Sequence, residues 1–98
     1  MANGQRGEVD LVCGDQRLVL CLTLGALAEI ETALGGDVAT RMQRLKATDL
    51  VAILRALLKG GGELEAARQV ERLPLDPADV ARAIAAAFTA ASAEAGAA

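Results

Sequence analysis

Two segments near the start of the chain alternate between apolar and polar residues. The alternation runs from Glu8 to Cys13 and again from Arg17 to Leu22, and a period of two is typical of half-buried strands. Gly14 and Asp15 lie between them, and a glycine in the first position suits a type II′ turn. A two-residue loop predicts a register that pairs Cys13 with Gln16, Leu11 with Leu18 and Val9 with Leu20. We therefore expect an antiparallel hairpin over residues 8–22, which must pack on helices because a lone hairpin is marginal in water.

From Thr23 onward, apolar residues recur every three or four positions, which is the period of an amphipathic helix. Helices are predicted over residues 24–34, 49–59 and 77–92, with Thr23 and Asp76 as N-caps. Two weaker segments are also helical in pattern: one after Asp37 that carries Val38, Met42 and Leu45, and a polar one over 63–73 with Leu64, Ala67, Val70 and Glu71 on one face. The predicted fold is α+β, with an N-terminal antiparallel β-hairpin packed on a bundle of four to five short helices. Residues 8–92 are expected to form one domain, and 1–7 and the alanine-rich 93–98 to be disordered.

The helix predicted over 49–59 is apolar over an unusually wide arc. Its spacing of i, i+3, i+4, i+7 and i+8 is filled by Leu50, Ile53, Leu54, Leu57 and Leu58. Val51 and Leu58 are expected at the exposed edge of that arc. Thr48 can cap the helix, and Gly60 can end it in the left-handed conformation. Since one glycine suffices as a stop, Gly61 and Gly62 predict a freely turning segment.

Composition narrows the functional classes. The chain has 98 residues and a net charge of −3, so one modest core is expected, and the acidic balance argues against nucleic-acid binding. The single aromatic, Phe88, is predicted to be the main anchor of the last helix, in line with Val80 and Ile84. No apolar run reaches the ~20 residues of a membrane span, and the N-terminus lacks a signal-peptide core. We expect a soluble cytoplasmic protein.

Catalytic chemistry is poorly supplied. The chain contains no histidine and no tyrosine, so acid–base or nucleophilic catalysis would rest on Cys, Asp, Glu or Lys alone. Cys13 and Cys21 form no metal-ligand pattern, and the predicted register puts them on opposite faces, which excludes a disulfide between them. The glycines at 60–62 follow a helix rather than a strand, unlike a phosphate-binding loop. We expect no enzyme activity, no metal and no cofactor.

One acidic and three basic residues allow alternative interpretations. Glu31 falls within the apolar arc of the helix over 24–34, where its carboxylate can either reach out to solvent at the edge or form a buried ion pair with Arg41 or Arg44. Arg41, Arg44 and Lys46 make a small basic cluster in RMQRLK. A solvated face accounts for this cluster, and a helix–turn–helix is the alternative.

Several segments, in a fixed order, resemble one known family. RGEV at 6–9, the strand–turn–strand, LTLGALAEIE at 22–31 and DLVAILRALLKGGG at 49–62 are similar to the small tail protein of gene transfer agents and related siphophages. That family is classed with phage tail assembly chaperones and is sometimes labelled a tail tube protein. The resemblance covers residues 6–62 and continues more loosely through DPADVARAIAAAF at 76–88.

The resemblance implies a non-enzymatic assembly factor that acts with the tape measure protein, the tail tube protein or both in the bacterial cytoplasm. Together with the wide apolar arc, it predicts that a helical client segment docks beside the 49–59 helix. The predicted partner-binding residues are Val51, Leu54, Leu58, Gly60, Gly61 and Gly62. Two alternatives stay open: a structural tail component that self-associates, and a small helical DNA-binding regulator.

Overall fold

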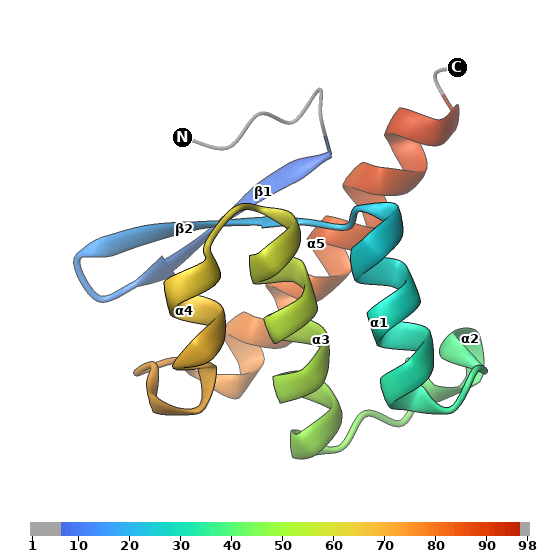
Figure 1. Cartoon of the computed structure of the whole chain (residues 1–98), viewed down its shortest axis with the longest axis horizontal. Coiled ribbons are helices and arrows are strands. Elements are labelled where there is room, and N and C mark those ends of the chain that lie inside the picture. Colours follow the sequence, from blue (N-terminus) through green and yellow to red (C-terminus); the bar gives the residue numbers. More distant parts are fainter. Residues whose placement is uncertain (1–6, 97–98) are drawn as a thin grey trace.

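The computed structural model describes residues 7–96 and, for residues 93–96, the backbone alone. A two-stranded hairpin is followed by five α-helices and one 3₁₀ turn (Figure 1). In chain order the elements are β1 (Glu8–Cys13), β2 (Gln16–Cys21), α1 (Leu24–Leu34), α2 (Val38–Arg41), α3 (Ala47–Gly60), α4 (Leu64–Arg68), η2 (Val70–Arg72) and α5 (Pro77–Gly96). The predicted α+β fold is confirmed.

The hairpin has the register that its alternation predicts. Cys13 pairs with Gln16, Leu11 with Leu18 and Val9 with Leu20. Gly14 has a φ of 60°, as the first position of a type II′ turn requires. This register places Cys13 on the buried face and Cys21 on the opposite one, and both are reduced thiols.

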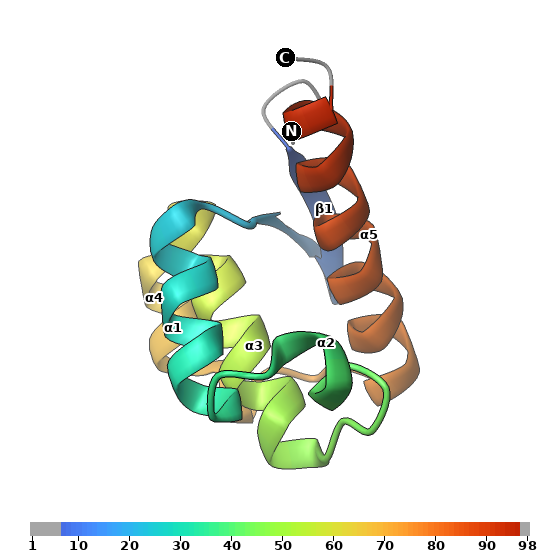
Figure 2. The ribbon, with the colours of Figure 1, turned by 90° about the vertical axis from the view of Figure 1, so that its right-hand side faces the viewer.

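Helix α3 is the central element of the structure. It packs against α1, α4, α5 and strand β2, with α1 and α4 on its two flanks (Figure 1). Figure 2 shows β1 lying along α5 on one side of the molecule, while α1, α3 and α4 stand on the other. The hairpin thus joins the two sides, since β1 packs on α5 and β2 on α3.

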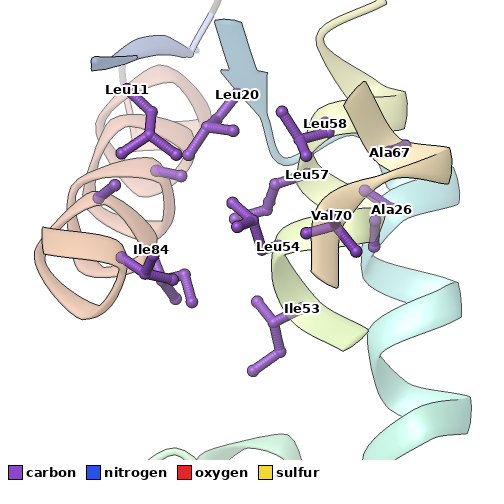
Figure 3. Close-up of a cluster of buried hydrophobic side chains, with 14 of the residues drawn as sticks. Leu11, Leu20, Ala26, Ile53, Leu54, Leu57, Leu58, Ala67, Val70 and Ile84 are labelled. Atoms are coloured by element: carbon purple, nitrogen blue, oxygen red, sulfur yellow. The ribbon is translucent and has the colours of Figure 1, made fainter. Parts of the chain in front are cut away.

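The core lies between α3, α5 and the inner face of the hairpin (Figure 3). Leu11 and Leu20 project from the strands toward side chains of α3 and toward Ile84 of α5. Burial of one such aliphatic side chain contributes about 1.5–3 kcal/mol to folding. The largest fully buried side chains are Leu20, Ile30, Ile53, Leu57, Leu58 and Ile84.

Helix ends follow local capping. Thr23 caps α1 by accepting a hydrogen bond from the Ala26 N–H at 3.0 Å, and Asp76 accepts one from Ala78 at 2.9 Å at the start of α5, both as predicted. Thr48 was the wrong cap for α3, because the helix begins at Ala47 and the Asp49 carboxylate accepts the hydrogen bond of the Lys46 N–H.

The predicted segment boundaries need three further corrections. The α2 helix is a single turn that ends at Arg41, and the 63–73 segment divides into α4 and η2 at Gln69. Residues 93–96, expected to be disordered, continue α5 as helix. Of the other residues with predicted disorder, Gly7 is described and is buried, and 1–6 and 97–98 lie outside the described part of the chain.

Two leucines at helix starts are exposed, and one of them, Leu64, was predicted to lie on an apolar helix face. Leu24 is 85% exposed and Leu64 is 58% exposed. Each is the first residue of its helix, and because helical side chains lean toward the N-terminus, these two project past the end of the packed surface. Phe88, the predicted main anchor of α5, is only partly buried, whereas Ile84 and Ala87 of the same helix are buried completely.

Candidate functional site

An apolar groove opens between α3, η2 and the beginning of α5. Its volume is about 200 Å³. We call it the apolar groove, and it is lined by Ala47, Leu50, Val51, Leu54, Val70, Glu71, Leu73, Leu75, Pro77 and Val80. Nine of these ten side chains are uncharged and nonpolar, so the groove suits an apolar group rather than a polar ligand.

The groove has a buried floor and a half-exposed rim. Leu54, Val70 and Val80 are 3%, 5% and 6% exposed and form the floor. Val51 is half-buried at the rim, and one turn along α3 brings it beside Leu54. A second hollow next to it is lined by Val51, Ala47, Thr48 and Glu71. The rim is therefore where an incoming apolar side chain would make its contact.

An ion pair stands at one end of the groove. The Arg55 guanidinium lies 3.0 Å from the Glu71 carboxylate and also donates a hydrogen bond to the Ala67 carbonyl at 3.4 Å. Among the described residues that line the groove, Glu71 is the one with a charged side chain. This arrangement can bind and orient an apolar segment, and the lining offers one carboxylate for acid–base chemistry.

The structure separates the predicted partner-binding residues. Val51 and Leu54 lie together in the apolar groove. Leu58 does not reach the surface: its exposure is 0%, so its predicted place at the exposed edge is wrong. The reason is that the C-terminal part of α3 passes under strand β2, which covers Leu58 (Figure 3).

The glycines at the end of α3 do not line the apolar groove either. Gly60 and Gly61 lie against the backbone of strand β2. Gly60 is the last helical residue, and Gly62, with a φ of 83°, takes the left-handed conformation predicted for Gly60. A Cβ at Gly60 would overlap the Cys21 carbonyl, and one at Gly61 the carbonyl of Val19. These two glycines therefore permit a close backbone approach, and the predicted freely turning segment is wrong.

Glu63 completes the contact at this edge. Its carboxylate accepts a hydrogen bond from the Val19 N–H at 2.8 Å, although the two residues are 44 positions apart. A side chain thus accepts the hydrogen bond of a backbone N–H at the edge of strand β2. This arrangement also hinders pairing of that edge with another strand.

The predicted buried ion pair between Glu31 and Arg41 or Arg44 is wrong. Glu31 is exposed, and the Nη2 of Arg41 instead contacts both carboxylate oxygens of Asp49, at 3.0 and 2.8 Å. Asp49 lies in the first turn of α3, and the fold of the chain between α2 and α3 brings it next to Arg41. The cluster in RMQRLK consequently leaves Arg44 and Lys46 exposed.

Asp49 is the buried charged residue of the described chain, with 6% exposure. The hydrogen bond from the Lys46 N–H, followed by that from Arg41, lowers the pKa of the Asp49 carboxyl below 3.8. Both interactions favour the charged carboxylate. Asp49 therefore ties α2 to the N-terminus of α3 in its ionised form.

Sequence reasoning missed the second wall of the groove. Leu73 and Leu75 come from the irregular segment between η2 and α5, and Pro77 is the first residue of α5. The irregular segment has no helical or strand period from which the direction of its side chains could be predicted. The tripeptide Leu-Asp-Pro at 75–77 predicts the start of the helix. It does not predict that the leucine before the cap folds back toward α3.

The described residues lack two other kinds of functional feature. No cluster of three or more His, Cys, Asp or Glu residues in the described chain is arranged to hold a metal ion. None of the helices described for residues 7–96 combines the length and apolarity needed to cross a membrane.

Comparison with known proteins gives one family. The model of the family described as "Phage tail tube protein, GTA-gp10" matches residues 6–94 of this chain, which includes both strands, all five helices except the last residues of α5, and every residue of the apolar groove. No curated protein and no solved structure matches the chain.

Proposed function

Because this chain belongs to the family of the phage tail tube protein GTA-gp10, we propose that it acts as a tail assembly chaperone of a gene transfer agent or phage. In this proposal it binds a helical segment of the tape measure protein in the bacterial cytoplasm and keeps it soluble until the tube polymerises. It does so without enzymatic chemistry and without a cofactor.

The apolar groove is the observation that carries the proposal. It is open to solvent, apolar in nine of ten lining residues, and includes Val51 and Leu54. A groove of about 200 Å³ receives a few side chains rather than a whole helix. The client helix would therefore lie across the rim and insert anchors from one face, spaced at i and i+4.

Anchoring of this kind fits a temporary complex. Full burial of one leucine or isoleucine side chain is worth about 1.5–3 kcal/mol, and association costs several kcal/mol in lost freedom. Two or three anchors then give weak binding that a polymerising tube can displace. The Arg55–Glu71 pair at the end of the groove would limit how far the client slides along α3.

Co-expression with the tape measure and tail tube proteins of the same particle tests the proposal. Affinity capture of the chain should retain the tape measure protein, and Val51→Glu should abolish that retention and the client's solubility, since a carboxylate at the rim opposes an apolar anchor. Val12→Glu is the matched control, because Val12 is 63% exposed on β1 and does not line the groove.

Two results would contradict the proposal. One is that neither tail protein is retained by the wild-type chain while particles assemble normally in a strain that lacks the gene. The other is that Val51→Glu and Val12→Glu retain the client equally well.

A structural role in the tail is the second candidate, and the description of the matching family as a tail tube protein favours it. The two roles differ in where the protein ends up. A chaperone is absent from purified particles, whereas a tube component is present in many copies. Quantitative mass spectrometry of purified particles separates the two.

A further inference from the structure

The two walls of the apolar groove differ in how firmly the fold holds them. One wall is α3, a helix of 14 residues that packs against α1, α4, α5 and β2. The other wall is formed largely by residues 69–75, which contain the three-residue turn η2 and the irregular residues after it. We call residues 69–75 the η2 wall. A short segment at the surface opens locally more easily than a central helix, so the width of the groove depends on what holds the η2 wall in place.

Burial holds the η2 wall most firmly at Val70, which is 5% exposed and lies in the floor of the groove. The backbone hydrogen bonds of the turn are local. The Arg72 N–H donates to the Gln69 carbonyl at 2.8 Å, and the Leu73 N–H donates to the Val70 carbonyl at 3.3 Å. These two bonds maintain the shape of the turn but do not attach it to α3.

Arg55 attaches the η2 wall to α3 through its side chain. Its Nε donates a hydrogen bond to the Ala67 carbonyl of α4 at 3.4 Å, and its Nη2 donates one to the Glu71 carboxylate of η2 at 3.0 Å. The two acceptors lie on either side of Gln69, where α4 ends and η2 begins. A guanidinium presents several donors in one rigid plane, so a single side chain of α3 fixes the position of both segments.

We infer that Arg55 is the positioning residue of the apolar groove: its guanidinium holds the η2 wall against α3 and thereby sets the width of the groove. Val70 and Glu71 line the groove, so a shift of η2 moves surfaces that a client would contact. Arg55 is not among the lining residues and acts through these two. The inference rests on the proposed function for its consequence, which is client binding, but not for the contact itself.

The contact matters for the groove more than for overall stability. The side chains of Arg55 and Glu71 are 37% and 71% exposed, and exposed ion pairs contribute little to the free energy of unfolding. The core beside the groove consists of apolar side chains, which do not depend on this pair. Loss of the guanidinium should therefore loosen the η2 wall while α3, α5 and the hairpin keep their packing.

Arg55→Met tests the inference, because methionine keeps an unbranched apolar stem and lacks the guanidinium. Lys59→Met is the matched control, since it removes the same charge from the same helix. The ion pair of Lys59 with Glu29 is similarly exposed, at 46% and 50%, but it joins α3 to α1 rather than to the η2 wall. Urea unfolding followed by circular dichroism should give midpoints close to that of the wild type for both variants.

Amide hydrogen exchange measured by NMR reports on the η2 wall directly. In Arg55→Met the amides of Arg72 and Leu73 should exchange about tenfold faster than in the wild type, because the local opening that exposes them loses two opposing hydrogen bonds. The amide of Leu57, in the buried part of α3, should exchange at the wild-type rate. All three amides should be unchanged in Lys59→Met.

Two further variants separate a specific contact from a general loss of packing. Arg55→Lys keeps the charge but not the planar arrangement of donors, and it should restore part of the slow exchange. Glu71→Gln should speed exchange in the wild-type background and have little further effect in Arg55→Met, because substitutions that remove the same contact are not additive.

Capture of the tape measure protein measures the consequence for binding. Arg55→Met should lose most of the client that the wild type retains, and Lys59→Met should retain as much as the wild type. A wild-type chain that retains no client would contradict the proposed function, whereas the exchange rates of the η2 wall do not involve the client and test the role of Arg55 separately.

Three results would overturn the inference. The amides of Arg72 and Leu73 could exchange at the same rate in Arg55→Met as in Lys59→Met. Exchange in Arg55→Met could instead rise equally in η2 and in α3, which would make Arg55 a part of the general packing. The third is full retention of the client by Arg55→Met despite faster exchange, which would mean that the position of the η2 wall does not determine binding.

Discussion

Replacing Gly60 with alanine should destabilise the protein, although helix propensity alone predicts the opposite. Gly60 lies within α3, and alanine is favoured over glycine in a helix by about 1 kcal/mol. The structure opposes this preference, because a Cβ at Gly60 would come closer to the Cys21 carbonyl than the 3.0 Å that real Cβ atoms keep. The atom in the way belongs to the backbone of β2 and cannot rotate aside.

The size of the expected loss of stability depends on which elements must move apart. Relief of the overlap requires α3 and β2 to separate, and overpacking of this kind costs about 1–3 kcal/mol. Separation also strains the hydrogen bond from Val19 to Glu63, and a hydrogen bond to a charged group contributes about 1.5–3 kcal/mol. After the gain in helix propensity, we expect a net loss of about 2–4 kcal/mol, a large part of the stability of a small domain.

Thermal unfolding followed by circular dichroism measures this loss. For a domain of this size it should lower the midpoint by about 10–25 °C. Gly25→Ala is the matched control, since its nearest non-neighbour atom is the Thr23 Oγ1 at 3.9 Å, and it should leave the midpoint unchanged or raise it. Gly62→Ala, where no atom lies within 4 Å but φ is +83°, should cost about 1 kcal/mol through backbone strain. A Gly60→Ala variant as stable as the wild type would refute the close-approach argument.

Three further predictions concern single contacts. The pKa of Asp49 in the folded state is lowered from 3.8, so its contribution to stability is fully present above pH 3.8 and is lost as the pH falls through the folded pKa. Urea unfolding at neutral and acidic pH should therefore show a smaller acid-induced drop in the free energy of unfolding for Asp49→Asn than for the wild type. An equal drop for both proteins would contradict this role of Asp49. Glu63→Gln should cost about 1 kcal/mol and speed hydrogen exchange at the Val19 amide, which unchanged exchange would contradict. Phe88→Ala should lower the free energy of unfolding by about 2 kcal/mol, less than for a fully buried ring because Phe88 is only partly buried; a loss below about 1 kcal/mol would mean that α5 is loosely attached.

Local patterns in the sequence were sufficient for the hairpin and for most helix starts. The register follows from the loop length and the alternation alone, because a one-residue slip would expose every apolar side chain of a strand. Thr23, Asp37 and Asp76 cap their helices through hydrogen bonds to residues two or three positions ahead, which sequence spacing specifies. Both features depend on contacts between residues close in the chain.

Contacts across the fold were not predictable from the same patterns. The sequence around Glu63 does not indicate that its carboxylate reaches Val19. Three consecutive glycines can serve either as a flexible turn or as a place where two backbone segments come close, and the sequence does not distinguish these roles. Only the arrangement of α3 under β2 decides between these meanings. Asp49 shows the same limit, since its pairing with Arg41 depends on how the chain turns between α2 and α3.

For a related reason, the sequence predicted one wall of the candidate site but not the other. Val51 and Leu54 belong to a helix with a clear period, and that period predicts the direction in which their side chains point. The opposite wall of the apolar groove comes from η2 and from the irregular residues 73–75, whose facing no period specifies. Leu58 is buried because strand β2 packs on α3, and the helical period of α3 does not indicate this neighbour.

The width of that arc now has a structural reason. Helix α3 contacts α1, α4, α5 and β2, and neighbours on so many sides require apolar residues around most of its circumference. A wide arc is therefore what a central helix needs for folding and is not by itself evidence for a client. Only a small part of this apolar surface is left available for a client. It is the half-buried Val51, at the rim of an open groove whose floor is already packed. For this reason the proposed function depends on Val51 rather than on the apolar character of α3 as a whole, and Val51→Glu tests it with little effect on the core.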